Sequence, residues 1–522
     1  MRRYSWLYAL ILIVAFVLRA HQLTDYPPAI NTDEAVNVID GFQIARSGSF
    51  PLYEEDQGRP EPLYQLLMAA VTVAWGSSVW GMRLASVFLS LLTVAVIGWV
   101  TRLALRDLPA TTRHVSAAGA MIALTVMIGD LTLSRTLYRT NLELLCVLLS
   151  MGFVLRALGS LRRRDFILGG IFGGLVLYTY TSGWAFPLGF AGLGITLILF
   201  QRRQWRRWLP GMLLFTLCAA VIAAPVVFLA LTHPRAVFGR AQDVLGGGGN
   251  IIELILPAVR QFYQAGDVNP EYNVAAAPIL SATFLPLFLI GLAGLIARLR
   301  TPSALFLLTL LAVFNLPVVL SNEIPHGLRV ASEYVIVAII IAVGIAMIFT
   351  LAKYLPLLRA DPLRLRVALL ALIALLLLHG QFAWGIYRDF WQHPDASPLW
   401  KAYGLRLDHN EWFFRTDRED FARWLNAQTT PILLPVDELQ QANTRTWVLP
   451  TYPTVTTAGA DFRLPPQTTL MIPWSLELGD TMTATTSFAL LDHGVITLLP
   501  PLASATHDQL ISLLPGGTPI SR

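Results

Sequence analysis

Long apolar segments recur along the first three quarters of the chain. Eleven of them come close to the length that an α-helix needs to cross a bilayer, about 20 mostly apolar residues. We predict spanning helices over residues 5–20, 83–105, 115–130, 142–158, 166–182, 184–200, 209–231, 279–297, 303–320, 333–352 and 367–385. The pattern predicts a polytopic membrane protein that is mainly α-helical.

A twelfth apolar segment, residues 63–79, is shorter, and the distribution of positive charge decides its placement. Cytoplasmic loops retain an excess of Lys and Arg. If residues 63–79 do not cross, every basic cluster between the apolar segments lies on one side, together with the N-terminus. If they cross, all clusters after the first lie outside. We therefore predict an interfacial or re-entrant helix here and a cytoplasmic N-terminus.

This topology places a long first loop, about residues 21–82, on the extracytoplasmic side. Shorter loops near residues 131–141 and 321–332, and a longer one near 232–278, lie on the same side. Most carboxylates of the membrane half fall in these loops. Chemistry that uses carboxylates should therefore face outward.

The chain changes character after residue 385, where Pro, Thr, Trp and Asp become frequent. A helix is predicted over residues 419–427, followed by β-prone runs at 431–434, 446–449, 468–472 and 495–499. We predict a transmembrane domain over residues 1–385 and a small α/β extracytoplasmic domain over residues 386–522.

Composition excludes a soluble or disordered protein, because 55% of the residues are hydrophobic, only 14% are charged and mean hydropathy is +0.57. The net charge of +5 comes with 36 arginines among 38 basic residues. Many form short clusters between apolar segments, so they indicate topology and no nucleic-acid partner. Cys146 and Cys218 both lie in apolar segments, which argues against a disulfide framework or a thiolate metal site.

The first external loop contains Asp33 and Glu34 directly after Asn31 and Thr32. One interpretation is a helix start, with Asn31 or Thr32 as the cap and two acids at the positive end of the helix dipole. The other is a general base that accepts a proton from a substrate hydroxyl at the membrane surface. The two are compatible, since a cap would fix the geometry of the carboxylate.

Other external loops supply further candidate binding residues. The second loop carries Arg135 and Arg139, which oppose the positive-inside rule; an anionic ligand and pairing with Asp33 or Glu143 are equally open explanations. His326 and Arg329 are three residues apart and can together hold a phosphate. Weaker candidates for substrate binding are Arg59, Tyr64, Asn141, Asp267 and Asn273.

Taken together, these features resemble the GT-C superfamily of integral membrane glycosyltransferases. The likeness is to bacterial glycosyltransferase family 39, which is related to protein O-mannosyltransferases and to the aminoarabinose transferase that acts on lipid A. It covers about residues 1–385, and its motifs agree in order, spacing and external placement. They are Asp33-Glu34, Pro62-Leu63-Tyr64, Met82-Arg83-Leu84, Ser134-Arg135 through Arg139 and Asn141, Tyr178-Thr179-Tyr180 to Pro187, Gly266-Asp267 with Asn273, and His326 with Arg329.

The resemblance implies a GT-C fold and transfer of a monosaccharide from a polyprenyl-phosphate donor to an acceptor hydroxyl outside the cytoplasm. Asp33 is then the general base or orients the acceptor, and Glu34 supports it. Arg135, Arg139, His326 and Arg329 are then candidates to stabilise the leaving lipid phosphate. The implied partners are the lipid-linked donor, the membrane lipid, and a protein or glycolipid acceptor.

Two departures from the family pattern limit what the resemblance implies. Asn141 stands where some relatives have an acid, so a divalent metal has no support in the sequence, and no required cofactor can be read from it. Trp184 stands where relatives often have Arg, which points to a different phosphate clamp or sugar.

The alternatives to a monosaccharide transferase are an oligosaccharide transferase of the same superfamily and a non-enzymatic transporter or assembly protein. A transporter is disfavoured because the predicted spans are nearly free of charge at their centres.

Overall fold

The computed structural model describes residues 2–27, 30–48, 62–76, 79–234, 251–274, 276–321 and 324–392, and five strands between residues 432 and 498. The chain divides into two compact units. The first comprises Met1–Leu23, Phe50–Leu66 and Arg83–Gly404, and the second comprises Thr24–Ser49, Leu67–Met82 and Leu405–Arg522. Each unit is described by itself.

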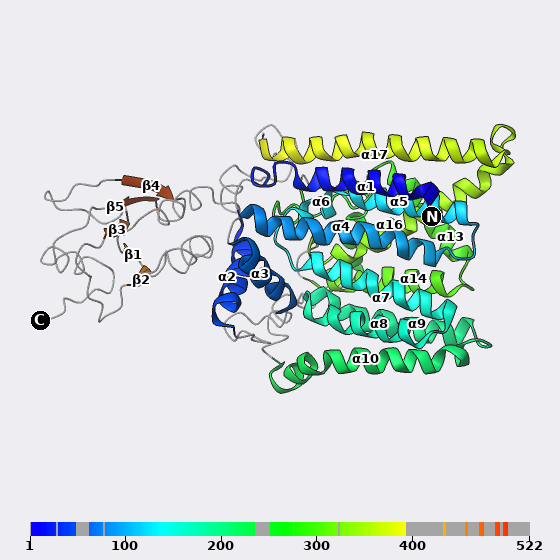
Figure 1. The fold of residues 1–522 in the computed structure, drawn as a ribbon, viewed down its shortest axis with the longest axis horizontal. Helices are drawn as coiled ribbons and strands as arrows, with labels where there is room; N and C mark the ends of the chain where they lie inside the picture. Colours follow the sequence, from blue (N-terminus) through cyan, green and yellow to red (C-terminus); the bar gives the residue numbers. More distant parts are fainter. Residues whose placement is uncertain are drawn as a thin grey trace, which may run out of the picture. The chain divides into compact units, whose positions relative to one another are not determined.

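The first unit is a bundle of apolar helices, and each of the eleven predicted segments lies in one or more of them (Figure 1). The helices are α1 (Arg2–Ala20), α4 (Val79–Ala104), α5 (Ala110–Val126), α6 (Ile128–Ser134), α7 (Thr140–Ser160), α8 (Arg163–Leu175), α9 (Phe186–Phe200), α10 (Trp205–Thr232), α13 (Phe284–Ala297), α14 (Pro302–Phe314), α16 (Ala331–Leu351) and α17 (Asp361–Gln392).

Seven helical segments in the described part of the chain are long and apolar enough to cross a membrane, and an eighth is added if the bent pair of α5 and α6 is one span. The shorter apolar helices include Tyr4–Ala20 of α1 and Phe284–Ala297 of α13. The chain is therefore a multi-pass membrane protein. The predicted segment 115–130 is not one straight helix, because α5 and α6 meet at an angle of 66°.

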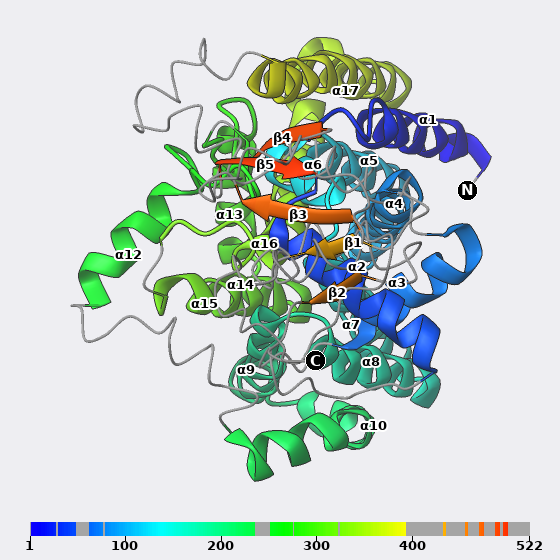
Figure 2. The ribbon, with the colours of Figure 1, turned by 90° about the vertical axis from the view of Figure 1, so that its left-hand side faces the viewer.

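Helix α16 lies at the centre of the bundle (Figure 2), and most of its residues are buried. It packs against α5, α7, α13 and α14. Its approach to α13 is close because glycines face each other: a Cβ on Gly291 would lie 1.9 Å from the Ile340 carbonyl oxygen, and one on Gly344 would lie 2.0 Å from that of Leu287. Small residues of this kind let helix backbones pack closely in membranes.

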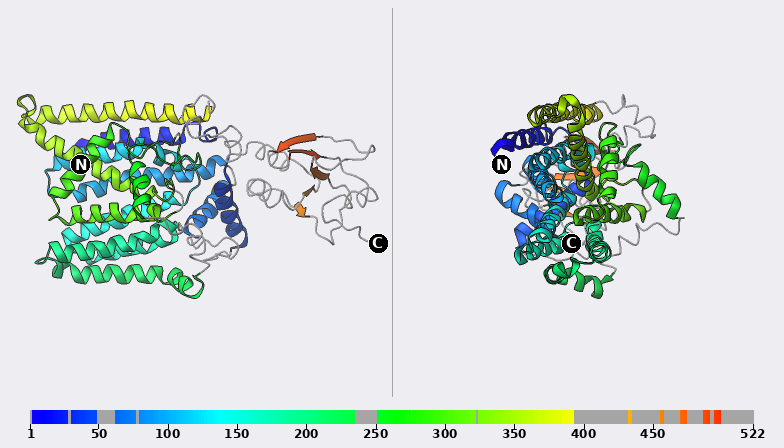
Figure 3. Two further views of the ribbon diagram at one scale, coloured as in Figure 1. Left: turned by 180° about the vertical axis from the view of Figure 1, so that it is seen from behind. Right: turned by 90° about the vertical axis from the view of Figure 1, so that its right-hand side faces the viewer.

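The outer helices expose apolar side chains, as expected for surfaces that face lipid. Helices α10 and α17 lie at opposite edges of the bundle (Figure 1 and Figure 3). Leu213 and Leu217 on α10, and Leu370 and Leu378 on α17, are each more than 60% exposed. Short elements complete the unit, namely η1 (Val176–Tyr178), η2 (Thr181–Ala185), α12 (Ile251–Arg260), α15 (Leu316–Val319), η3 (Ala352–Tyr354) and η4 (Pro356–Leu358).

Two helices of the predicted first external loop are present. Helix α2 (Thr32–Ser47) lies in the second unit, and α3 (Pro62–Trp75) contributes residues to both units. Helix α3 begins at Pro62, where a proline costs no hydrogen bond. Its 14 residues extend about 21 Å, which is less than the roughly 30 Å hydrocarbon core. Helix α13 has the same length, so the placement of residues 63–79 outside the spans stays a prediction.

The second unit also contains a five-stranded mixed sheet with strand order β2-β1-β3-β5-β4. The strands are β1 (Ile432–Leu434), β2 (Val455–Thr457), β3 (Thr469–Pro473), β4 (Thr486–Leu490) and β5 (Gly494–Leu498). Strands β1, β3 and β5 fall on the β-prone runs 431–434, 468–472 and 495–499. The predicted helix at 419–427 and the run at 446–449 lie outside the described residues, and the domain boundary at 385/386 stays a prediction.

Candidate functional site

The start of α2 positions Asp33 and Glu34 through a capping box. The Asn31 side chain accepts a hydrogen bond from the Glu34 backbone N–H at 2.8 Å, and the Glu34 carboxylate accepts one from the Asn31 N–H at 3.1 Å. This arrangement satisfies two backbone donors at the helix start. Of the two predicted caps, the structure therefore selects Asn31.

The two acids have different surroundings. Glu34 is fully buried and belongs to the capping box, whereas Asp33 lies one position earlier and is partly exposed. A carboxylate at this position is stabilised by the positive end of the helix dipole. Asp33 is therefore the more accessible of the two acids.

In the first unit, Asp267 joins two loops that are distant in sequence. Its carboxylate accepts a hydrogen bond from the Asn269 N–H at 2.8 Å and another from the Gly327 N–H at 2.7 Å. Asn273 closes the first of these loops, because its side-chain amide donates to the carbonyl oxygens of Asp267 at 3.0 Å and Ala277 at 2.9 Å. The structure thus places the predicted residues Asp267 and Asn273 next to the segment that carries His326.

Aromatic rings connect these loops to the loop near residues 131–141, which the sequence predicted to be external. The Tyr272 ring stacks on the imidazole of His326, with centroids 5.1 Å apart, and meets Tyr138 edge-on at 5.5 Å. A Cβ on Gly327 would lie only 2.8 Å from Cβ of Tyr272, so the contact needs glycine at that position. We call Tyr138, Asp267, Tyr272, Asn273, His326 and Gly327 the Asp267–His326 cluster.

Two cations adjoin this cluster along the chain. Arg139 follows Tyr138, is only 6% exposed, and places its guanidinium over the ring of Tyr180, 5.9 Å from the centroid. Arg329 lies two residues after Gly327 and is partly exposed. Stacking on an aromatic face orients a guanidinium while its edge remains able to donate hydrogen bonds. Arg139, His326 and Arg329 thus belong to or adjoin the Asp267–His326 cluster along the chain, and their binding of an anion stays a prediction.

Arg135 has other partners. It is fully buried, and its guanidinium donates to the carbonyl oxygens of Leu18, Arg19 and Gln22 at 2.9–3.0 Å. It also lies over the rings of Trp384 and Tyr387, at 5.2 and 5.1 Å. Burial lowers the pKa of Arg135, yet a guanidinium stays protonated at neutral pH. These contacts anchor Arg135 beside the end of α1, and its contact with the donor phosphate stays a prediction.

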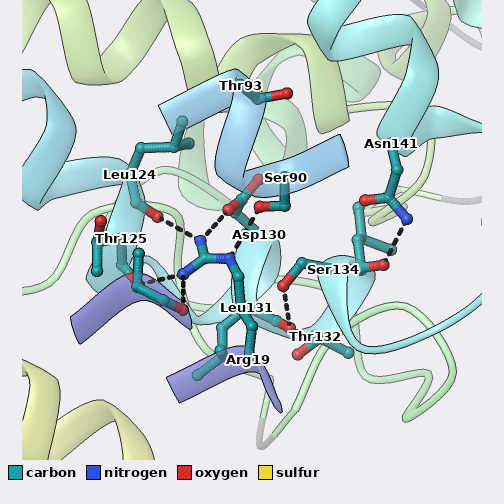
Figure 4. Close-up of polar contacts among 12 residues, drawn as sticks. Arg19, Ser90, Thr93, Leu124, Thr125, Asp130, Leu131, Thr132, Ser134 and Asn141 are labelled. Atoms are coloured by element: carbon teal, nitrogen blue, oxygen red, sulfur yellow. Dashed lines mark hydrogen bonds and ion pairs between the residues drawn. The ribbon is translucent and has the colours of Figure 1, made fainter. Parts of the chain in front are cut away.

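The neighbouring Arg19 forms a buried network around the break between α5 and α6 (Figure 4). It donates to the Asp130 carboxylate at 2.6 Å, to Ser90 at 2.8 Å, and to the carbonyl oxygens of Leu124 and Thr125 at 3.3 and 3.2 Å. A bent helix frees backbone carbonyls, and in a membrane these need new donors. Arg19 supplies them.

Asn141 and Tyr64, both predicted to contact substrate, are held within the protein. The Asn141 amide donates to the Leu133 carbonyl oxygen at 2.7 Å, at the end of α6 (Figure 4). The Tyr64 hydroxyl lies 2.8 Å from Oγ of Ser86 on α4, and its side chain is fully buried. These contacts support positioning roles. Arg59 lies outside the described residues.

A buried carboxylate that the sequence did not single out for chemistry lies near the start of α7. The Glu143 carboxylate accepts hydrogen bonds from the hydroxyls of Ser182, at 2.9 and 2.8 Å, and of Ser332, at 2.6 Å. It thereby joins α7, η2 and α16. The sequence feature that could have identified Glu143 is an acidic residue in the first turn of an otherwise apolar helix.

Neither Tyr272 nor Tyr138 could be recognised from the sequence as the link between the loops, because no sequence pattern predicts ring stacking between residues so far apart.

Among the residues that the structure describes, no group of three or more His, Cys, Asp and Glu side chains is placed to hold a metal ion.

No family model matches the sequence, and no curated protein matches it. The fold does match solved structures. ArnT from Cupriavidus metallidurans bound to undecaprenyl phosphate is 13% identical, with a TM-score of 0.59 and coverage of 95% of this chain and 98% of that one. The same protein in the apo state is 14% identical, with a TM-score of 0.57 and the same coverage.

An oligosaccharyltransferase from Archaeoglobus fulgidus, in complex with Zn and sulfate, is 13% identical and covers 86% of this chain and 62% of that one; its TM-score of 0.47 is too low to support an argument. The ArnT match extends over nearly the whole of both chains. The chain therefore has the GT-C fold of ArnT, which confirms the predicted fold class of the membrane part, whereas the C-terminal α/β domain stays a prediction.

Proposed function

We propose that this protein is a membrane glycosyltransferase that moves a monosaccharide from a polyprenyl-phosphate donor to an acceptor hydroxyl on the extracytoplasmic side. The observation that carries the proposal is the near full-length similarity to ArnT, whose structure contains undecaprenyl phosphate. The external clusters of acidic and basic groups support the same activity, because they provide a base for the acceptor and cations for a phosphate.

Arg139, His326 and Arg329 are the proposed donor-phosphate residues. As the glycosidic bond breaks, negative charge grows on the phosphate that leaves with the lipid, and preoriented cations stabilise that charge most strongly where water is scarce. Arg139 is nearly buried and oriented by Tyr180, and His326 is oriented by Tyr272. A phosphate leaves without protonation, so the reaction needs a base but no separate acid.

Asp33 is the proposed base, which takes the proton of the acceptor hydroxyl as its oxygen attacks the sugar carbon. The capping box beneath it fixes the start of α2, so Glu34 acts as a positioning residue. Asp267 and Asn273 hold the loop that presents Tyr272 to His326. In this proposal they order the donor site, as Tyr64 and Asn141 order the helices around it. The acceptor is a protein or a glycolipid, and residues 386–522 form an extracytoplasmic domain.

The test is sugar transfer by purified protein from a radiolabelled polyprenyl-phosphate sugar, with membrane extract as the acceptor source. Asp33→Asn should lower transfer by about 10²-fold or more, which is the usual contribution of general base catalysis. Glu34→Gln is the matched control, because glutamine also completes a capping box. It should retain most of the activity.

Equal loss in both variants would assign the effect to the helix start and remove the base from the proposal. Full activity of Asp33→Asn would also remove it. Folding is checked by the unfolding temperature of each variant in detergent, which Asp33→Asn should leave nearly unchanged.

A further inference from the structure

A polar cavity lies far from the Asp267–His326 cluster. It encloses about 550 Å³ where four connections meet, namely those between α4 and α5, α7 and α8, α9 and α10, and α13 and α14. Leu158 and Gly159 line it at the end of α7, whereas Arg139 precedes the start of that helix. The 21 residues of α7 separate the two places by about 30 Å.

Hydrogen bonds between the four connections hold the walls of the cavity in place. Trp208 donates from Nε1 to the Leu158 carbonyl oxygen at 3.0 Å. Arg106 donates to the Leu155 carbonyl oxygen at 3.3 Å. The Arg106 guanidinium also lies against Gly159, where a Cβ would be 2.2 Å from its Nη1.

Two further contacts close the other sides. Gln201 donates from its side-chain amide to the Arg300 carbonyl oxygen, and Arg298 pairs with Asp107 at 3.0 Å. Residues of helices α7 and α10 and of the connections that follow α4, α9 and α13 therefore shape the cavity.

The lining is basic. Three arginines, Arg106, Arg207 and Arg300, line the cavity with one acid, Asp107, so the lining carries three positive charges and one negative, a net +2. The single acid is itself paired with Arg298 outside the lining. Such a set of guanidiniums suits an oxyanion, since each can donate two parallel hydrogen bonds to phosphate oxygens.

The start of α14 adds to this positive character. Thr301, Pro302 and Ser303, which are its cap and first two residues, line the same cavity. Pro302 has no N–H and the Ala304 N–H donates to Thr301 Oγ1 at 3.3 Å, so the helix start contributes mainly through the positive end of the helix dipole. The helix start and the three arginines thus favour the same kind of ligand.

We propose that this cavity binds a phosphate group, supplied either by an anionic phospholipid headgroup or by a soluble phosphate. The surroundings favour the lipid: Leu161 lines the cavity and is 40% exposed, and Leu199 and Phe200 beside it are 55% and 51% exposed. Basic pockets at the ends of membrane helices bind anionic headgroups in this way. The site is separate from the proposed transfer reaction.

The test measures binding of phosphatidylglycerol, phosphatidylcholine and inorganic phosphate to the purified full-length protein in detergent, by native mass spectrometry for the lipids and calorimetry for phosphate. The double variant Arg207→Gln/Arg300→Gln should bind phosphatidylglycerol at least tenfold more weakly than the unaltered protein. Both side chains are exposed, so the variant should fold. The matched control is Arg202→Gln/Arg203→Gln, which removes two exposed charges that do not line the cavity and should change binding less than twofold.

Phosphatidylglycerol bound in preference to phosphatidylcholine, without displacement by inorganic phosphate, identifies the lipid as the source. Inorganic phosphate that binds and is lost in the double variant identifies a soluble phosphate, and either result supports the site. Equal loss in the control, unchanged binding in the double variant, or no binding of any probe overturns the proposal. If the double variant unfolds, Arg207→Glu compared with Arg203→Glu provides the same test with single exposed residues.

Discussion

Arg19 and Asp130 form an ion pair of 2.6 Å in which the Arg19 side chain is fully buried and that of Asp130 is 3% exposed. Arg19 is near the end of α1, and Asp130 lies in α6, just after the break between α5 and α6. The pair therefore attaches the first helix to a bent one at a point where the backbone of the bent helix lacks its own donors.

We expect Asp130→Ala to cost about 3–5 kcal/mol of stability, because it leaves a guanidinium buried without its carboxylate. The matched control is Asp389→Ala, which removes an acid from the exposed pair with Arg388 and should cost at most about 1 kcal/mol. Thermal unfolding of the purified variants in detergent measures both. Equal losses would mean that burial does not govern the Arg19–Asp130 pair. Arg19→Met/Asp130→Leu should recover much of the stability, since it removes both charges.

Substitutions at Arg135 and Arg139 should have different effects, the first mainly on stability and the second mainly on sugar transfer. Arg135 donates to three carbonyl oxygens at the end of α1, so we expect Arg135→Gln to destabilise the fold by about 2–4 kcal/mol. Arg139→Gln should lower sugar transfer at least tenfold while stability changes by about 1 kcal/mol or less, the range for a cation over an aromatic ring. Unfolding temperature and transfer rate are measured on the same samples. A stable but inactive Arg135→Gln would return Arg135 to the donor site.

Gly327→Ala should disturb the Asp267–His326 cluster. The added methyl group would lie 2.8 Å from Cβ of Tyr272 and 3.0 Å from its backbone oxygen, so the loop must move away from Asp267. We expect transfer to fall at least tenfold, with a smaller change in unfolding temperature. The matched control is Gly385→Ala, where a Cβ meets nothing within 4 Å. Full activity of Gly327→Ala would show that the contact between the two loops is not needed.

The helices could be predicted because a helix that lies in lipid or in the protein core needs a continuous apolar segment, which is visible in the sequence. The break between α5 and α6 could not, since the sequence around Met127 is as apolar as the rest of the segment. Arg135 illustrates a second limit. The sequence suggested an anionic ligand or a protein carboxylate as its partner, but its guanidinium donates to backbone carbonyl oxygens at and just after the end of α1, which side-chain patterns do not predict.

Only the part of the candidate site that depends on local sequence could be predicted. Asp33 and Glu34 could be placed at a helix start from the residues beside them, because a capping box is local. Asp267, Asn273 and His326 were chosen from two separate loops, and only the fold brings them together through Tyr272. The contacts of Glu143 with Ser332 and of Arg19 with Asp130 join residues more than a hundred positions apart in the sequence. Only the packing of the helices brings them together.

The bend between α5 and α6 also constrains the order in which the protein is assembled. Arg19 enters the membrane with the first helix, but Leu124, Thr125 and Asp130, which receive its hydrogen bonds, are synthesised more than a hundred residues later. Until then its charge needs water or lipid headgroups as partners. The first helix should therefore remain shallow or mobile in the bilayer during biosynthesis and reach its final depth only when the bent pair has been inserted.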